Sequence, residues 1–253
     1  SGISMEYDLR LLPVEQVESI EIMKGAASTL YGSGAATGLI NIKLKKSGKK
    51  SLSGNAYFNV GTNTTATQQN QKAADFIQGF SINGRTTKLS YFTALNSTET
   101  NGISQIAPPN PNVNYEEDPF SRLNYMAKVG YSVSDKMTLD FFGNYDQIKN
   151  DYDGGFDNTG TSDTNLNKTS SKQFRFGFSP KFKYNKGEFI INSSLNKLVR
   201  SYDELDTYSN SVGFSQYESR SVNVDGFNKY QISNSFYLVS GLQYQFHDAN
   251  SVT

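Results

Sequence analysis

Apolar and polar positions alternate along most of the chain after Ser51. The stretch from residue 173 to residue 184 shows the pattern most clearly. Its even positions are Phe174, Phe176, Phe178, Phe182 and Tyr184, with Pro180 as the one exception, and its odd positions include Gln173, Arg175, Ser179, Lys181 and Lys183. Successive side chains of a β-strand point to opposite faces. The sequence therefore predicts a strand with one apolar face and one polar, charged face.

The same alternation predicts nine strands in the larger part of the chain. They run roughly over residues 51–62, 73–83, 88–98, 121–134, 136–150, 171–185, 187–203, 217–233 and 235–248. Two further strands are predicted nearer the start, at Val17–Met23 and at Leu39–Leu44, with one short helical turn at Ala26–Leu30. The prediction is an all-β chain with a small α+β segment at its N-terminus.

The predicted connections alternate between short turns and long polar loops. Short turns fall at residues 83–87, 134–136, 185–187 and 233–235, and long loops at about 63–72, 99–120, 151–170 and 204–216. Outer-membrane barrels have short turns on one rim and long loops on the other. This rhythm favours an antiparallel meander within a transmembrane barrel, with all short turns on one rim, Phe174, Phe176 and Phe178 toward lipid, and Arg175 toward the lumen. A water-soluble β-sandwich and a β-solenoid are the alternatives.

Composition narrows the class of protein. Lys plus Arg equals Asp plus Glu at 24 each, which does not favour nucleic-acid binding, and the absence of cysteine excludes a disulfide framework. A mean hydropathy of −0.55 and the lack of an 18-residue apolar run exclude a transmembrane helix. The only histidine is His247, and no Gly-x-Ser-x-Gly motif accompanies it, so we do not expect an enzyme. We expect His247 on the inward, polar side of the last strand.

Residues 17–42 closely resemble the end of the plug domain in TonB-dependent outer-membrane receptors. The resemblance rests on a strand that ends in Lys-Gly, then small residues, Leu-Tyr-Gly-Ser-Gly-Ala, and an Ile-Asn-Ile strand. The motif positions are Gly25, Tyr31, Gly32, Gly34, Gly38 and Asn41. Ala26 departs from the pattern, since many members have proline there. The glycines also suit the positive φ values and close backbone approach of a plug wedged inside a barrel.

The resemblance implies a domain organisation and a set of partners. Residues 1–46 would be the C-terminal part of the plug, and residues 47–253 the first nine strands or so of a 22-stranded barrel in the bacterial outer membrane. The protein would be a receptor and transporter for a scarce nutrient, energised by the TonB–ExbB–ExbD complex through a box absent from this chain. Further implied partners are outer-membrane lipid, a small-molecule ligand and a surface lipoprotein.

A second resemblance concerns the ligand. The runs Asn144-Tyr145-Asp146 and Asn150-Asp151-Tyr152-Asp153 resemble the third extracellular loop region of vitamin B12 (cobalamin) receptors. That resemblance makes cobalamin the expected ligand. A ferric siderophore or another small nutrient is the alternative within the family, and a soluble β-rich carbohydrate-binding domain is the alternative from another class.

Calcium is the one cofactor that the sequence suggests. Asp151, Asp153 and Asp157 lie within seven residues, beside Gly154 and Gly155, and Asp203 and Asp206 lie in the next loop. Calcium takes 6–8 oxygen ligands, so a group of carboxylates suits it. The EF-hand pattern fails, because the twelfth position counted from Asp151 is Ser162. The alternative is an ordinary solvated acidic loop.

Nine strands are not expected to close into a barrel. The outermost strands would expose unpaired backbone groups at membrane depth, where each costs several kcal/mol. An odd number of strands would also bring the two edges together in parallel, unlike the even, antiparallel barrels of bacteria. We therefore expect the chain to be part of a longer polypeptide and to be inactive in transport by itself.

Overall fold

The computed structural model describes residues 17–25, 38–45, 48, 50–64, 72–104, 106, 115–154, 156–157, 160–161, 164–206 and 208–252. Every regular element in these ranges is a β-strand. The strands are β1 (Val17–Lys24), β2 (Gly38–Leu44), β3 (Ser53–Gly61), β4 (Asp75–Arg85), β5 (Leu89–Thr100), β6 (Phe120–Ser134), β7 (Met137–Asp151), β8 (Phe156–Asp157), β9 (Gly160–Thr161), β10 (Lys168–Tyr184), β11 (Gly187–Asp206), β12 (Ser211–Gln231) and β13 (Tyr237–Val252). The described residues contain no helix of the length and apolarity that crossing a membrane requires.

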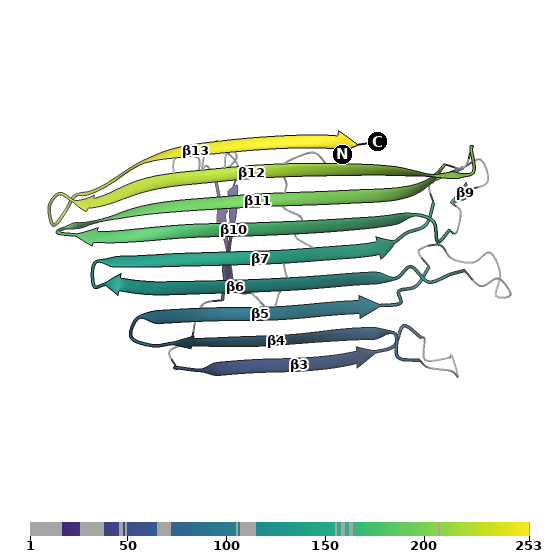
Figure 1. The fold of residues 1–253 in the computed structure, drawn as a ribbon, viewed down its shortest axis with the longest axis horizontal. Coiled ribbons are helices and arrows are strands. Elements are labelled where there is room, and N and C mark those ends of the chain that lie inside the picture. Colours follow the sequence, from purple (N-terminus) through teal and green to yellow (C-terminus); the bar gives the residue numbers. More distant parts are fainter. Residues whose placement is uncertain are drawn as a thin grey trace.

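Nine of the strands form one antiparallel meander, which confirms the predicted fold. Their order in the sheet is β13-β12-β11-β10-β7-β6-β5-β4-β3 (Figure 1). Apart from the short β8 and β9, the strands of this sheet that follow one another along the chain are therefore neighbours in it. The four short turns, after β4, β6, β10 and β12, lie on one rim, as predicted. In the turn between β10 and β11, Lys186 has a φ of 64°, the left-handed conformation that tight hairpin turns require.

The long-loop rim differs from the prediction in two places. The loop predicted at residues 204–216 is wrong, because β11 and β12 pair without a break as far as Asp206 and Ser211, leaving only residues 207–210 between them. Within the predicted loop 151–170, β8 and β9 form a very short hairpin. At this rim the strands pair beyond the point at which apolar and polar residues stop alternating, because backbone hydrogen bonds do not depend on side-chain polarity.

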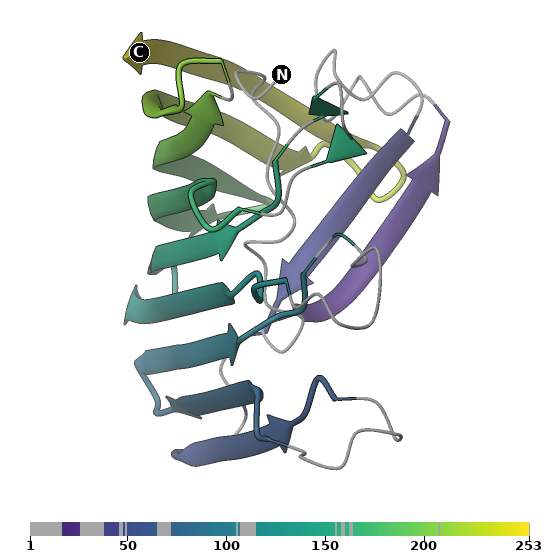
Figure 2. The ribbon, with the colours of Figure 1, turned by 90° about the vertical axis from the view of Figure 1, so that its right-hand side faces the viewer.

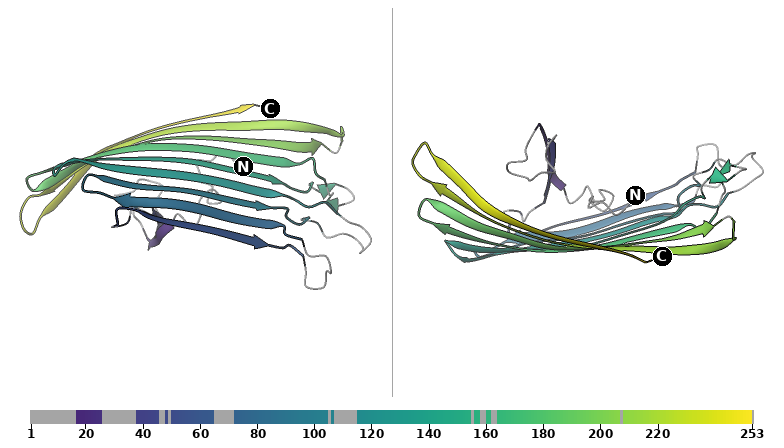
Figure 3. Two further views of the ribbon diagram at one scale, coloured as in Figure 1. Left: turned by 60° about the horizontal axis from the view of Figure 1, so that its bottom comes forward. Right: turned by 90° about the horizontal axis from the view of Figure 1, so that it is seen from above.

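The sheet is curved, and the β1–β2 hairpin lies on its concave side (Figures 2 and 3). Leu44 at the end of β2 packs there against the small buried cluster of Phe92, Ala94 and Met126. The predicted helical turn at Ala26–Leu30 lies outside the described residues.

The convex face carries the apolar side chains. Phe174, Phe176 and Phe182 are 47%, 44% and 48% exposed. Arg175 lies on the concave face, where it bonds Asp146. The predicted register of this strand is therefore confirmed, because a slip of one residue would exchange the two sets.

Candidate functional site

The β1–β2 hairpin fixes three of the predicted plug-motif residues. Asn41 donates a hydrogen bond of 3.0 Å to Glu21, which also bonds Lys43 across the hairpin. Gly25 has a φ of 101°, which favours glycine, and a Cβ on Gly38 would lie 3.0 Å from the carbonyl oxygen of Met23. The other motif residues, Tyr31, Gly32 and Gly34, lie outside the described residues.

Two hydrogen bonds join the segment after β2 to the wall of the sheet. The Lys128 ammonium donates to the carbonyl of Lys45 at 3.4 Å, and the amide of Gly48 donates to Asn83 Oδ1 at 3.0 Å. Together with the packing of Leu44, these contacts attach the hairpin's exit to β4, β5 and β6. The predicted domain boundary between residues 46 and 47 falls outside the described residues and stays a prediction.

A buried polar network crosses the middle of the concave face. Asn124 on β6 donates to Asp146 Oδ1 at 2.8 Å, and Arg175 on β10 donates to Asp146 Oδ2 at 3.3 Å. Asp146 is 1% exposed, so the negative charge of its carboxylate is stabilised by these donors and not by water. On the next strand pair, Gln173 donates to Asn196 at 2.8 Å. The arrangement offers hydrogen bonds to whatever lies against it and contains no nucleophile–base pair.

The strands toward β3 extend this polar surface. The Tyr57 hydroxyl donates to Asn96 Oδ1 at 3.1 Å, reaching from β3 to β5 across Gly79 on β4. A Cβ on Gly79 would lie 2.4 Å from the tyrosine ring, so the bridge depends on the missing side chain. His247 lies on the same concave face at the other side of the sheet, since its register partner Ser221 is also the partner of Asn196. This is the inward position that the sequence predicted.

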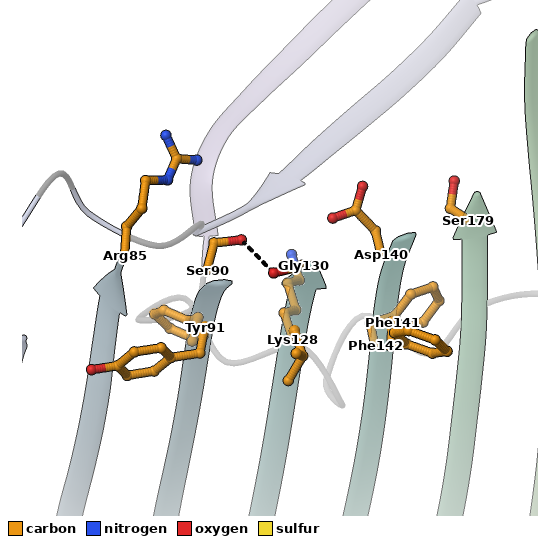
Figure 4. Close-up of a pocket in the computed structure, with 11 residues that line it drawn as sticks. Arg85, Ser90, Tyr91, Lys128, Gly130, Asp140, Phe141, Phe142 and Ser179 are labelled. Atoms are coloured by element: carbon orange, nitrogen blue, oxygen red, sulfur yellow. Dashed lines mark hydrogen bonds between the residues drawn. The ribbon is translucent and has the colours of Figure 1, made fainter. Parts of the chain in front are cut away.

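A hollow of about 320 Å³ lies against the concave face (Figure 4). Arg85, Lys128 and Asp140 line it from three different strands. The Ser90 hydroxyl donates to the carbonyl of Gly130 at 3.4 Å within it. The mixture of charges and aromatic rings gives this hollow no preference for one class of ligand.

The long-loop end of the concave face carries basic and phenolic side chains that sequence reasoning missed. Arg122, which bonds Thr98 Oγ1 at 3.3 Å, lies at the same level as Arg200 and Tyr217. Tyr202 meets Tyr217 edge to face, with ring centroids 6.1 Å apart. Guanidinium groups and aromatic rings side by side suit an anionic, aromatic ligand. Extending the alternation of residues 187–203 along the strand could have found this set.

The acidic residues at the same rim tie the long loops together. Asp153 accepts hydrogen bonds from the amide of Ile106 at 3.1 Å, from the Ser104 hydroxyl at 3.2 Å and from the amide of Thr164 at 3.3 Å. Nearby, the Tyr152 hydroxyl donates to Glu204 at 2.8 Å. Partial burial and this bond to a carboxylate raise the pKa of Tyr152 above its ordinary value. Asp153 therefore acts as a clasp between two loops.

The predicted calcium ligands are not gathered into one group by the described geometry. Asp151 pairs with Lys168 at 3.6 Å, and Asp206 accepts hydrogen bonds from Tyr208 and Ser209 of its own turn. Asp203 lies half-buried on β11, and the side chain of Asp157 is outside the described part of the molecule. In the part that is described, no three His, Cys, Asp or Glu side chains come together as a metal site. Calcium binding stays a prediction.

Comparison with known proteins adds the family context. Residues 1–39 match the model of the TonB-dependent Receptor Plug Domain. The chain is 25% identical to the ferric enterobactin receptor of Pseudomonas aeruginosa over 206 residues, covering 74% of this chain and 26% of that receptor. It is 38% identical to the ferrienterobactin receptor of Escherichia coli K12 over 78 residues, covering 30% of this chain and 10% of that receptor.

Solved structures agree on the fold. The siderophore receptor PirA from Acinetobacter baumannii matches with a TM-score of 0.71 and 16% identity, over 96% of this chain and 36% of that one. A ferric enterobactin receptor from Pseudomonas aeruginosa matches with a TM-score of 0.69 and 18% identity, over 96% and 38%. The chain thus spans well under half the length of these relatives. The first 39 residues therefore match part of a TonB-dependent receptor plug domain, and the nine-stranded sheet has the fold of the barrel wall in those solved receptors.

Proposed function

We propose that this chain is part of a TonB-dependent receptor that takes up a ferric siderophore. The observation that carries the proposal is the similarity to two enterobactin receptors, one of which aligns along 74% of the chain. The proposed energy source is the TonB–ExbB–ExbD complex, which drives receptors of this family.

The long-loop end of the concave face supports the same ligand class. Arg122 and Arg200 carry two positive charges there, and Tyr202 and Tyr217 add aromatic surface. Ferric complexes of catechol siderophores are anionic and aromatic, so cations and rings in one place complement them. Cobalamin, the ligand expected from the sequence, has no comparable support among these relatives. The proposed ligand is therefore ferric enterobactin or a close catecholate.

Uptake in a strain without other siderophore receptors tests this proposal. Cells that produce the full-length receptor should accumulate iron-55 from ferric enterobactin, and deletion of tonB should abolish the accumulation. Radiolabelled cobalamin and an uncharged hydroxamate complex serve as competitors and should not reduce the uptake. Accumulation of cobalamin but not of ferric enterobactin would overturn the siderophore proposal.

The lumen residues can be tested in the same cells. Replacing Arg122 and Arg200 together by Gln should weaken binding of ferric enterobactin at least tenfold, since each charge-assisted hydrogen bond contributes about 1.5–3 kcal/mol. The matched control replaces Lys136 and Lys186, two cations at the short-turn rim. An equal loss of binding in both variants would argue against a ligand site at the long-loop rim.

A further inference from the structure

Along β11, the side chains on the concave face change from positive to negative charge toward the long-loop rim. Arg200, Tyr202 and Glu204 occupy alternate positions, so they share one face of the strand. This is the concave face, because Asn196, four residues before Arg200, is the register partner of Arg175. Arg200 and Glu204 are separated by about 13 Å along an extended strand. A cation and a carboxylate therefore lie at two levels of one wall, with a phenol ring between them.

The carboxylate of Glu204 is positioned by a neutral donor. The Tyr152 hydroxyl donates to Glu204 Oε1 at 2.8 Å. The backbone holds the two residues together, because the amide of Tyr152 donates to the carbonyl of Asn167 at 3.1 Å and the amide of Leu205 donates to Asn167 Oδ1 at 2.7 Å. In the described part of the chain, no Lys or Arg side chain forms an ion pair with Glu204. Its negative charge is therefore oriented but not neutralised.

The neighbouring strand leaves Glu204 and Tyr202 accessible. Their register partners on β12 are Gly213 and Ser215, which are both small. The nearest described atom to a Cβ on Gly213 would be the carbonyl oxygen of Glu204, at 3.7 Å, so no described side chain fills the space above this glycine. Glu204 is also exposed. A ligand in the lumen can therefore approach the carboxylate from the side of β12.

A carboxylate next to phenol rings suits a cationic group. An ammonium is attracted to the face of an aromatic ring and forms a charge-assisted hydrogen bond with a carboxylate. The level of Arg122 and Arg200 has the opposite preference, because guanidinium groups bind anions. A ligand that complements both levels carries negative charge at one end and an ammonium roughly 10 Å away, since the separation along the strand is about 13 Å.

We infer that the preferred ligand is a catecholate siderophore that carries a protonated amine. Glu204 and Tyr202 bind the ammonium, while Arg122 and Arg200 bind the anionic ferric centre. The inference rests on the proposed function and names the subclass of siderophore that this site selects. Glu204 determines the specificity, because an exposed carboxylate attracts a complex that presents an ammonium and repels one that is anionic throughout.

The test compares two ferric complexes that differ in one charge. The first ligand is a tris-catecholate with one primary amine on its backbone, and the second is its N-acetyl derivative, which has the same iron centre without the cation. Binding of each ferric complex to the purified full-length receptor is measured by titration in detergent. The unmodified receptor should bind the amine complex about tenfold more tightly, since acetylation removes a charge-assisted hydrogen bond.

Three variants assign the preference to individual side chains. Glu204→Gln should remove most of the preference and should not weaken binding of the acetylated complex. Tyr202→Leu should lower the preference several-fold, whereas Tyr202→Phe keeps the ring and should retain it. The matched control is Glu218→Gln, which removes a carboxylate that bonds Lys197 and Arg220 on the convex face and should leave the preference unchanged.

The outcomes separate this inference from the proposed function. Equal affinity for the two complexes in the unmodified receptor would overturn the inference and leave the proposed function intact. A preference that survives Glu204→Gln would do the same. If neither complex binds, the proposed function fails and the inference fails with it. Heat-dependent mobility in gels confirms that each variant is folded.

Discussion

Arg175 and Asp146 form an ion pair at 3.3 Å between neighbouring strands on the concave face of the sheet. Asp146 is almost fully buried, whereas the Arg175 side chain is 23% exposed. The pair lies on the face opposite the outward Phe174 and Phe176. On this face of the sheet, buried polar side chains are therefore stabilised by bonds to other protein groups.

Replacing Asp146 by Ala should lower the free energy of unfolding of the full-length receptor by about 2–4 kcal/mol, because it removes the carboxylate that Arg175 and Asn124 both bond. Urea unfolding in detergent micelles, followed by tyrosine fluorescence, measures the loss. The matched control is Glu188→Gln, which breaks the more exposed pair with Lys229 at 2.8 Å and should cost under about 1 kcal/mol. Similar losses in both variants would contradict a special role for the buried pair.

Placing a charge on the convex face should cost more at mid-membrane than near the short turns. Phe178→Arg should destabilise the inserted receptor by about 2–4 kcal/mol, since this residue is the third of the five outward residues of β10 from Phe174 to Phe182. Phe182→Arg, two residues from the end of that strand, should cost about 0–1 kcal/mol. Folding titrations into lipid vesicles provide both values. The reverse order would mean that the apolar band is misplaced along the strand.

Gly79→Ala should disrupt the bridge between β3 and β5. The new methyl group would lie 2.4 Å from the ring of Tyr57, which must move and release its hydrogen bond to Asn96. We expect a loss of about 1–2 kcal/mol in unfolding free energy. Gly143→Ala is the control, because the nearest atom to its new methyl group is 4.0 Å away. In a Tyr57→Phe background, which already lacks this hydrogen bond, Gly79→Ala should cost less unfolding free energy. An equal cost in both backgrounds would mean that the hydrogen bond is not the interaction that is lost.

Asp153→Ala should open the long-loop rim. The clasp to Ser104 and Ile106 would be lost, so cleavage by the protease Glu-C at Glu116 and Glu117 should become several-fold faster. Because the clasp consists of hydrogen bonds, we expect the same acceleration of cleavage in the presence of calcium and in the presence of a chelator. An acceleration seen only in calcium would instead favour the calcium site predicted from the sequence. Asp135→Ala, at the short-turn rim, should leave the cleavage rate unchanged.

The contact between Tyr152 and Glu204 makes the stability of the long-loop rim depend on pH in the alkaline range. The pKa of Tyr152 is raised in the folded state, so the contact stabilises the loop fully below the ordinary tyrosine pKa of about 10 and is lost as the pH rises through the higher folded value. Difference absorbance at 295 nm between the receptor and its Tyr152→Phe variant isolates this titration. Glu204→Gln should shift the titration to lower pH, because it removes the carboxylate. An unshifted curve would mean that burial alone raises the pKa.

The sequence by itself determined the meander, the positions of the short turns and the orientation of Arg175 and Phe176. These features follow from local rules, because the two-residue alternation assigns a face to each side chain and the turn residues set the rim. The same local rules predicted the two strands near the start of the chain, which the structure confirms at Val17–Lys24 and Gly38–Leu44.

Only the tertiary structure decided which polar residues meet. Asp153 lies beside Asp151 in the sequence, but it bonds Ser104 and Ile106, which are more than 45 residues away, and so forms a clasp between loops. Arg122 and Arg200 reach the same level because three strand pairings of fixed register connect them. A linear pattern contains no register between distant strands. That register is set by the backbone hydrogen bonds of the whole sheet, and it determines which charges of the rim lie together.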